Sequence, residues 1–173
     1  TDLPHMLTDK ISWEKIVSEM GIKNEDKIVI YDNSDVVSSC RCWYNFIYFG
    51  HKPELVQVLD GGLKKWKKEN KITNNNLPTI LKSNYKADEK KKLVKNKLDI
   101  DKNIILKEFT VIDARSKERF EGNVAEPRKG LRSGSIKNSL CLPFTDLINE
   151  DGTFFDKDKI LEKFKTTKSD FNN

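Results

Sequence analysis

The pattern of apolar and polar residues near the start of the chain predicts two strand–helix pairs in close succession. Residues 27–31 and 55–59 are short apolar runs bounded by charged or turn residues, as strands are. A helical pattern follows each run, at 38–49 and at 63–69. Strands that alternate with helices at short intervals are typical of a parallel sheet covered by helices. We therefore predict an α/β fold for this part of the chain.

A further helix is predicted before the first strand. Thr8, Asp9 or Ser12 can cap its start, and Gly21 can end it. Its expected buried face carries four apolar residues, Ile11, Ile16, Val17 and Met20. The aromatic residues of the 38–49 helix also recur at helical spacing, which favours a place in the core; they are Trp43, Tyr44, Phe46 and Phe49.

The second half of the chain has a less regular pattern. We expect strands at 109–112 and 139–142 and a last helix at 157–164. Ahead of them lie an isolated strand-like run at 78–81 and a helix around 90–98. These elements continue the α/β pattern and suggest a second sheet.

Composition and charge narrow the class of protein. The 173 residues are 36% hydrophobic, which is enough for one large domain or two small ones, and no apolar run approaches the length of a transmembrane helix. The net charge of +5 is concentrated in residues 81–108, with nine Lys/Arg against five Asp/Glu, whereas residues 1–80 hold eleven of each. Because this segment lacks interleaved aromatic residues, we expect a solvated connector and no nucleic-acid surface.

The cysteines do not suggest a metal or redox site. Cys40, Cys42 and Cys141 form no CxxC pair, and the only histidines are His5 and His51. A zinc site is therefore not expected. Cys40 and Cys141 stand among small or apolar residues, so buried and inert thiols are the favoured interpretation.

Four arginines crowd into a polar loop after the 109–112 strand: Arg115, Arg119, Arg128 and Arg132. In a Lys-rich chain this choice suggests an anion site, because the guanidinium fork suits a carboxylate better than an ammonium does. The alternative is structural pairing with nearby acidic residues, namely Asp113, Glu118, Glu121 and Glu126. On residue types alone, structural pairing is the favoured interpretation.

Several ordered motifs resemble a known family. The runs VIYDNSD, CRCWYNFIYFGH and VQVLDGGLKKW resemble the first half of a tandem rhodanese-type sulfurtransferase. The run VIDARSKERFEGNVAEPRKGLRSGSIKNSLCLPFTDLINEDG resembles the opening of that family's second domain. The resemblance implies two α/β domains with mostly parallel central sheets flanked by helices, both incomplete. Residues 1–73 would be the C-terminal part of an inactive domain, 74–108 a linker and the start of the second domain, and 109–173 the N-terminal part of the catalytic domain.

The resemblance also implies an activity. Members of its 3-mercaptopyruvate branch move sulfur from 3-mercaptopyruvate to a thiol such as thioredoxin or a small thiol, or to cyanide, through a cysteine persulfide, and release pyruvate. No cofactor, metal, nucleic acid or membrane is implied, and the compartment, cytoplasmic or mitochondrial, cannot be read. The nucleophilic cysteine is expected after a strand that would follow Asn173, because residues 154–164 faintly repeat 7–17. Asp32 stands at the corresponding place in the first copy, so the chain alone is expected to be inactive.

Individual residues acquire roles from the same resemblance. Arg119, in ERF, and Arg128, in EPRKG, match the two arginines that bind the donor's carboxylate and keto oxygen. Arg128 distinguishes the mercaptopyruvate branch, since the thiosulfate branch resembles EPD there. Arg115 and Arg132 are expected to be structural, and His5, in PHML, resembles a histidine proposed to help a serine manage a proton.

Two other functions stay open at this stage. The chain could come from a thiosulfate sulfurtransferase (rhodanese), or from a non-catalytic rhodanese-homology module that binds proteins. A basic nucleic-acid-binding protein is the least favoured class, because both predicted folded parts are close to neutral.

Overall fold

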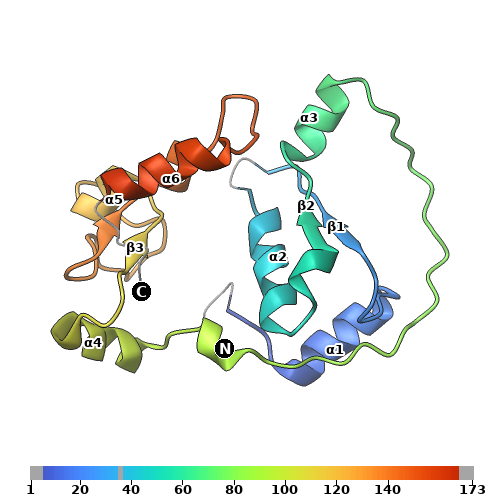
Figure 1. The fold of residues 1–173 in the computed structure, drawn as a ribbon, viewed down its shortest axis with the longest axis horizontal. Coiled ribbons are helices and arrows are strands. Elements are labelled where there is room, and N and C mark those ends of the chain that lie inside the picture. The colour runs from blue at the N-terminus through green and yellow to red at the C-terminus, as the bar shows by residue number, and fades with distance from the viewer. Residues whose placement is uncertain (1–5, 35–36, 168–173) are drawn as a thin grey trace. The chain divides into compact units, whose positions relative to one another are not determined.

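The computed structural model describes residues 6–34 and 37–167, and the chain divides into two compact units, Thr1–Val94 and Lys95–Asn173 (Figure 1). Each unit contains a short parallel sheet with helices around it. The predicted α/β class is confirmed. The segment at 74–108 divides between the two units, since residues up to Val94 cluster with the first.

The sheet of the first unit consists of β1 (Ile28–Ile30) and β2 (Val56–Val58). The strands pair in parallel with Ile28 opposite Val56, and the Leu59 N–H extends the ladder by donating to the Ile30 carbonyl at 2.8 Å. Both predicted strands are confirmed. Their pairing requires a crossover helix, because parallel neighbours cannot be joined by a tight turn.

That crossover helix is α2 (Ser39–Tyr48), and α3 (Gly62–Lys68) follows β2. The glycine turn before α3 brings two backbones together: the Leu63 N–H donates to the Asp32 carbonyl at 2.9 Å. A Cβ on Gly62 would lie 2.8 Å from that carbonyl oxygen, and the φ of Gly62 is +56°. Only glycine fits this approach without strain.

The first helix, α1 (Lys10–Glu19), begins where the sequence predicts. Asp9 caps it by accepting a hydrogen bond from the Ser12 N–H at 2.9 Å. The predicted buried face is wrong, however, because only one of its four residues is buried. Val17 is fully buried, whereas the other three are exposed: Ile11, Ile16 and Met20. The helix is rotated so that Trp13 and Val17 face the core, and the three exposed residues do not.

Aromatic rings make the core of the first unit. Trp13 of α1 stacks on Phe49 with ring centroids 4.7 Å apart, and it meets the edge of Phe46 at 5.1 Å. Both phenylalanines come from α2 or its end, as predicted from their spacing. These contacts join α1 to the far end of the crossover helix and so fix both against the sheet.

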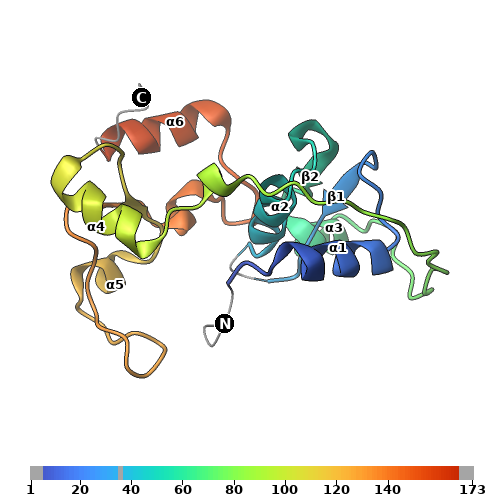
Figure 2. The same cartoon turned by 90° about the horizontal axis from the view of Figure 1, so that it is seen from below.

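A stretch that we call the returning segment, residues 83–90, completes this core. After α3 the chain runs in a wide arc and comes back along α1, which the two views in Figures 1 and 2 both show. Tyr85 is 1% exposed, and its N–H donates to the Ser18 side chain at 3.0 Å. Its hydroxyl lies 3.3 Å from Nδ1 of His51, whose Nε2 lies 3.0 Å from the Asp26 carbonyl oxygen. The expected solvated connector is therefore wrong for this segment.

The second unit holds β3 (Ile112–Asp113) and β4 (Leu140–Cys141), which pair in parallel with Ile112 opposite Leu140. The helices around them are α4 (Lys97–Leu106), α5 (Lys117–Glu121) and α6 (Lys157–Thr166). Both predicted strands are present but shorter than expected, and the last helix is confirmed. Among the described residues there are also three short 3-10 helices, at Pro53–Leu55, Lys91–Leu93 and Phe144–Leu147.

Two predicted elements before β3 are wrong. Residues 78–81 form no strand, and the helix expected around 90–98 is only a 3-10 turn, with α4 beginning later. Asn96 and Asp99 form a capping box, in which each side chain accepts a hydrogen bond from the other's N–H. This reciprocal cap determines where α4 begins.

None of the helices in the described part of the chain has the length and apolar character needed to cross a bilayer.

We predict that Tyr85→Ala destabilises the first unit by roughly 3–5 kcal/mol, the range for emptying a buried aromatic site. Urea unfolding followed by tryptophan fluorescence measures this unit alone, because all three tryptophans lie within residues 1–94. Leu81→Ala is the matched control, since Leu81 is 83% exposed in the same loop. An equal loss in both variants would contradict the assigned role of the returning segment.

Candidate functional site

The arginine-bearing stretch begins at the carboxyl end of β3. Asp113, the last strand residue, accepts a hydrogen bond from the Arg115 N–H at 3.0 Å, which turns the chain sharply out of the sheet. The Arg115 side chain then folds back on the same carboxylate, with Nε 2.9 Å and 3.0 Å from its two oxygens. The carboxyl ends of parallel strands are where open α/β sheets place their sites.

Arg115 connects three parts of the second unit. Besides Asp113, its Nη1 donates to Oε1 of Glu126 at 2.7 Å, and its Nη2 donates to the Gly134 carbonyl at 2.8 Å. All three nitrogens of the guanidinium are therefore hydrogen-bonded within the protein. The expectation that Arg115 belongs to internal ion pairs is confirmed.

Arg119 also pairs with Glu126. Its Nη2 donates to Oε2, and its Nε lies 3.3 Å from Oε1. The Glu126 side chain is 5% exposed, whereas that of Arg119 is 33% exposed. Two arginines and two carboxylates thus form one network that is neutral overall. We call these four residues the arginine–carboxylate network: Asp113, Arg115, Arg119 and Glu126.

The network shifts the titration of both carboxylates in the same direction. The hydrogen bond from Arg115 lowers the pKa of Asp113, against an opposing effect of burial. The hydrogen bond from Arg119, helped by the charges of both arginines, lowers the pKa of Glu126. Both carboxylates are therefore ionised at neutral pH and hold the two guanidiniums by charge-assisted bonds.

The loop at 122–134 is closed at its base and open at its tip. At the base, Gly122 passes Gly134 so closely that a Cβ on Gly122 would lie 3.3 Å from the Gly134 nitrogen. The Ser133 hydroxyl also donates to the Val124 carbonyl at 3.0 Å. The tip carries three exposed cations, Arg128, Lys129 and Arg132, and none of their side chains has a hydrogen bond or ion pair to another of the described residues.

The structure thus separates the predicted site residues. Arg119 lies in the network with a side chain that is 33% exposed, and Arg128 lies on the exposed tip two residues after Glu126. The structural alternative holds for Asp113 and Glu126, but Glu121 pairs instead with Lys117 at 3.7 Å. His5 lies outside the described residues. Substrate roles for Arg119 and Arg128 therefore stay predictions.

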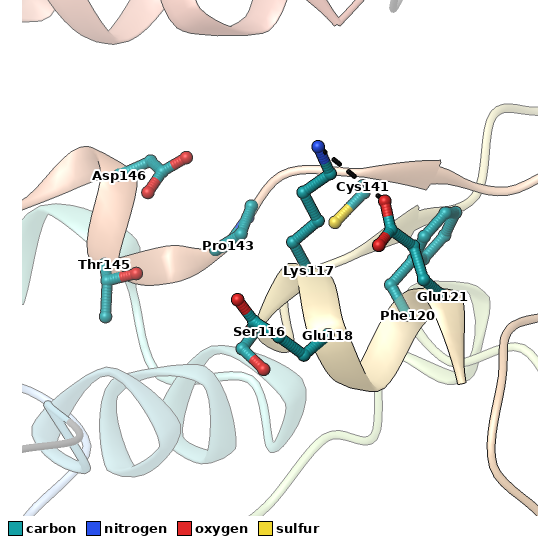
Figure 3. A pocket seen from close by; sticks show the side chains of 9 residues that line it. All are labelled: Ser116, Lys117, Glu118, Phe120, Glu121, Cys141, Pro143, Thr145 and Asp146. Carbon is teal, nitrogen blue, oxygen red and sulfur yellow. Dashed lines mark ion pairs between the residues drawn. The ribbon is translucent and has the colours of Figure 1, made fainter. Parts of the chain in front are cut away.

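Sequence reasoning missed a hollow of about 580 Å³ on another side of α5 (Figure 3). Its lining comes from α5 and from the loop after β4: Ser116, Lys117, Glu118, Phe120, Glu121, Cys141, Pro143, Thr145 and Asp146. Neither Arg119 nor Arg128 lines it. The signal that could have predicted it is the pairing of two parallel strands, because Ser116 and Pro143 follow their carboxyl ends.

The cysteine in this hollow is not built as a nucleophile. Burial raises the pKa of the Cys141 thiol, and the nearby charges of Asp113, Asp146 and Glu121 raise it further. Burial likewise raises the pKa of Cys40 and Cys42. A raised pKa leaves little thiolate at neutral pH, which agrees with the expected inert thiols. No group of three or more potential metal ligands occurs among residues 6–34 and 37–167.

In the first unit, Asp32 occupies a pocket of donors at the carboxyl end of β1. Its carboxylate accepts hydrogen bonds from the Ser34 N–H at 3.0 Å and from the Ser39 N–H at 2.5 Å. Burial acts to raise the pKa of Asp32, but these hydrogen bonds outweigh it and lower the pKa. The donors therefore hold a negative charge at the strand end, yet an aspartate there cannot carry a sulfane sulfur.

Comparison with known proteins gives consistent matches. Residues 4–69 match the rhodanese-like domain family. The chain is 33% identical to thiosulfate/3-mercaptopyruvate sulfurtransferase 1, mitochondrial, of Arabidopsis thaliana, over 95% of the chain and 48% of the relative. It is 32% identical to the 3-mercaptopyruvate sulfurtransferase of Mus musculus, over 96% of the chain and 56% of the relative. The chain therefore spans about half the length of the curated relatives it matches.

The fold agrees with the sequence matches. The whole chain superposes on 63% of SseA from Escherichia coli, a 3-mercaptopyruvate sulfotransferase with the rhodanese fold, with a TM-score of 0.86 at 24% identity. At this identity the likeness is one of fold. It confirms the predicted fold family for the described units.

We predict that acid weakens the second unit through the network. Because the pKa values of Asp113 and Glu126 lie below their ordinary values of 3.8 and 4.5, their stabilisation is complete above those values and is lost as the pH falls through the folded values. Asp113→Asn should reduce the slope of unfolding free energy against pH below about 3.8, the ordinary pKa of that carboxyl.

Amide hydrogen exchange or NMR should follow this change, because the second unit contains neither tryptophan nor tyrosine. Glu150→Gln, at an exposed turn, serves as the control. An acid slope in Asp113→Asn that matches the unsubstituted chain would contradict the assignment.

Proposed function

The chain belongs to the rhodanese family, and from that premise we propose that it supplies the donor-binding part of a sulfurtransferase that takes sulfur from 3-mercaptopyruvate. In this proposal the first unit is an inactive rhodanese-like domain, in which Asp32 replaces a nucleophile. The second unit belongs to the catalytic domain and carries the donor site. The acceptor is a thiol.

The observation that carries the proposal is the placement of the two matched arginines. Arg119 is partly exposed and uses only Nε and Nη2 in its pairing with Glu126, and Arg128 stands on a tip where no described carboxylate pairs with it. In the proposal, the free guanidinium of Arg128 and the oriented one of Arg119 bind the carboxylate and the adjacent keto oxygen of the donor, since both groups present acceptors in one plane. The local charge also attracts an anionic donor.

The choice of donor depends on Arg128. The names of the relatives do not decide it, because the Arabidopsis protein is named for both donors and the mouse protein for 3-mercaptopyruvate. Thiosulfate is a tetrahedral dianion, whereas 3-mercaptopyruvate presents a planar keto acid. A second guanidinium fork favours the planar donor, and the resemblance assigns an aspartate to this position in the thiosulfate branch.

The proposed reaction transfers one sulfur atom in two steps. A cysteine thiolate attacks the donor sulfur, the carbon–sulfur bond breaks, and the carbon leaves as the enolate of pyruvate, which takes up a proton. The resulting persulfide passes its outer sulfur to the thiolate of the acceptor. Cys40, Cys42 and Cys141 do not supply this thiolate in the proposal, because each thiol has a raised pKa.

We predict that the chain binds pyruvate, the planar keto-acid product, more tightly than thiosulfate, and that Arg128→Asp shifts this preference towards thiosulfate because the second fork is lost. The loss of one bidentate charge-assisted contact should weaken pyruvate binding by about tenfold or more. Titrations followed by NMR can give both affinities. Lys129→Asp is the matched control because it makes the same charge change on the adjacent exposed residue. If Lys129→Asp shifted the preference equally, the donor assignment would be wrong.

We also predict that the 173-residue chain forms no persulfide. After incubation with 3-mercaptopyruvate, pyruvate release should stay below one equivalent and no cyanide-labile sulfur should appear on the protein. Mass spectrometry of the three cysteine peptides checks the same point. Stoichiometric pyruvate with sulfur on Cys40, Cys42 or Cys141 would overturn this prediction.

A further inference from the structure

Glu126 is unusual for its place in the chain. It belongs to a loop whose tip is exposed and cationic, yet its own side chain is 5% exposed. A carboxylate is buried at this level only when its charge is compensated and its oxygens are hydrogen-bonded. The two arginines that compensate it are Arg115 and Arg119.

The two arginines are held differently. Arg115 is anchored by Asp113 and by the Gly134 carbonyl in addition to Glu126. Within the described residues, the hydrogen bonds of the Arg119 side chain go to Glu126 alone. Arg115 therefore fixes the position of Glu126, and Glu126 in turn fixes the plane of the Arg119 guanidinium.

The pairing uses only one edge of Arg119. Glu126 accepts hydrogen bonds from Nε and Nη2, which are two of the five N–H donors of a guanidinium. The edge formed by Nη1 and the second Nη2 hydrogen is not used by Glu126, and the side chain is 33% exposed. This is an edge that can bind a second carboxylate through two parallel hydrogen bonds.

We propose that Glu126 is a positioning residue for the sulfur donor, which holds Arg119 by its Nε–Nη2 edge so that the Nη1–Nη2 edge is presented to the carboxylate of a keto acid. The inference rests on the proposed function and adds to it a residue that does not touch the donor. Glu126 also compensates the charge of Arg119. The pair therefore offers directed donors with little net charge, which suits a monocarboxylate better than the dianion thiosulfate.

Binding of pyruvate and of thiosulfate to Glu126→Gln distinguishes the orientation of Arg119 from the compensation of its charge. The amide keeps the shape but loses one acceptor oxygen and the negative charge, so Arg119 is less well oriented and the site gains one positive charge. We expect pyruvate to bind about tenfold more weakly and thiosulfate to bind as well as before or more tightly. A purely structural role would weaken both ligands together.

Two further variants complete the experiment. Glu121→Gln is the control, because it removes the same charge from α5 at a side chain that pairs with Lys117 instead. Arg119→Lys should reproduce the loss of pyruvate binding, because it keeps the charge and removes the fork. The Nε–H resonance of Arg119 gives a readout without ligand: it should be protected from exchange in the unsubstituted chain and lose that protection in Glu126→Gln.

The outcomes distinguish this inference from the proposed function. If the unsubstituted chain binds pyruvate, and Glu126→Gln and Glu121→Gln weaken it equally, the positioning role of Glu126 is wrong while the donor site stands. If the unsubstituted chain binds pyruvate no better than thiosulfate, the donor assignment fails and the inference fails with it.

Discussion

Parallel pairing of two short strands determines which groups each unit places at the carboxyl ends of its strands. In both units an aspartate ends or follows the first strand and accepts a hydrogen bond from the N–H two residues later, Asp32 from Ser34 and Asp113 from Arg115, each at 3.0 Å. The two carboxylates then have different partners. Backbone N–H groups hold Asp32, so its charge is satisfied by the fold itself, whereas a guanidinium holds Asp113 and extends the contact into a loop. One local turn thus leads to a closed site in the first unit and to an open one in the second.

The sequence was informative where local chemistry decides structure. Strand pairs, their parallel order and the caps at Asp9 and Gly21 follow from short patterns, and the structure has them. The sequence was misleading where a segment distant along the chain determines which residues are buried. The buried face of α1 carries Trp13, which packs on Phe46 and Phe49, more than thirty residues away along the chain. No periodicity within residues 10–19 contains that information, so the apolar residues on the other side of the helix were wrongly placed in the core.

The arginine loop shows the same division. Residue types predicted both an anion site and internal ion pairs, and the described structure contains the pairs, with Glu126 at their centre. The pairs do not exclude a site, because a guanidinium can be held on one edge and used on the other. What sequence could not supply is the burial of the Glu126 side chain, which is 5% exposed in a loop whose base is closed by the approach of Gly122 to Gly134. Burial distinguishes a carboxylate that orients an arginine from one that merely neutralises it.

The returning segment has a consequence for how the chain would respond to cleavage. Residues 72–81 are exposed and without regular structure, whereas Tyr85 and Ala87 beyond them are buried against the first unit. A protease that cuts between residues 72 and 81 would therefore break the chain but leave the first unit folded. The C-terminal piece would stay bound to it through residues 83–90. The two pieces would migrate together in a native separation and come apart only in denaturant. In this sense the first unit is assembled from two segments, and the chain between them serves as a tether.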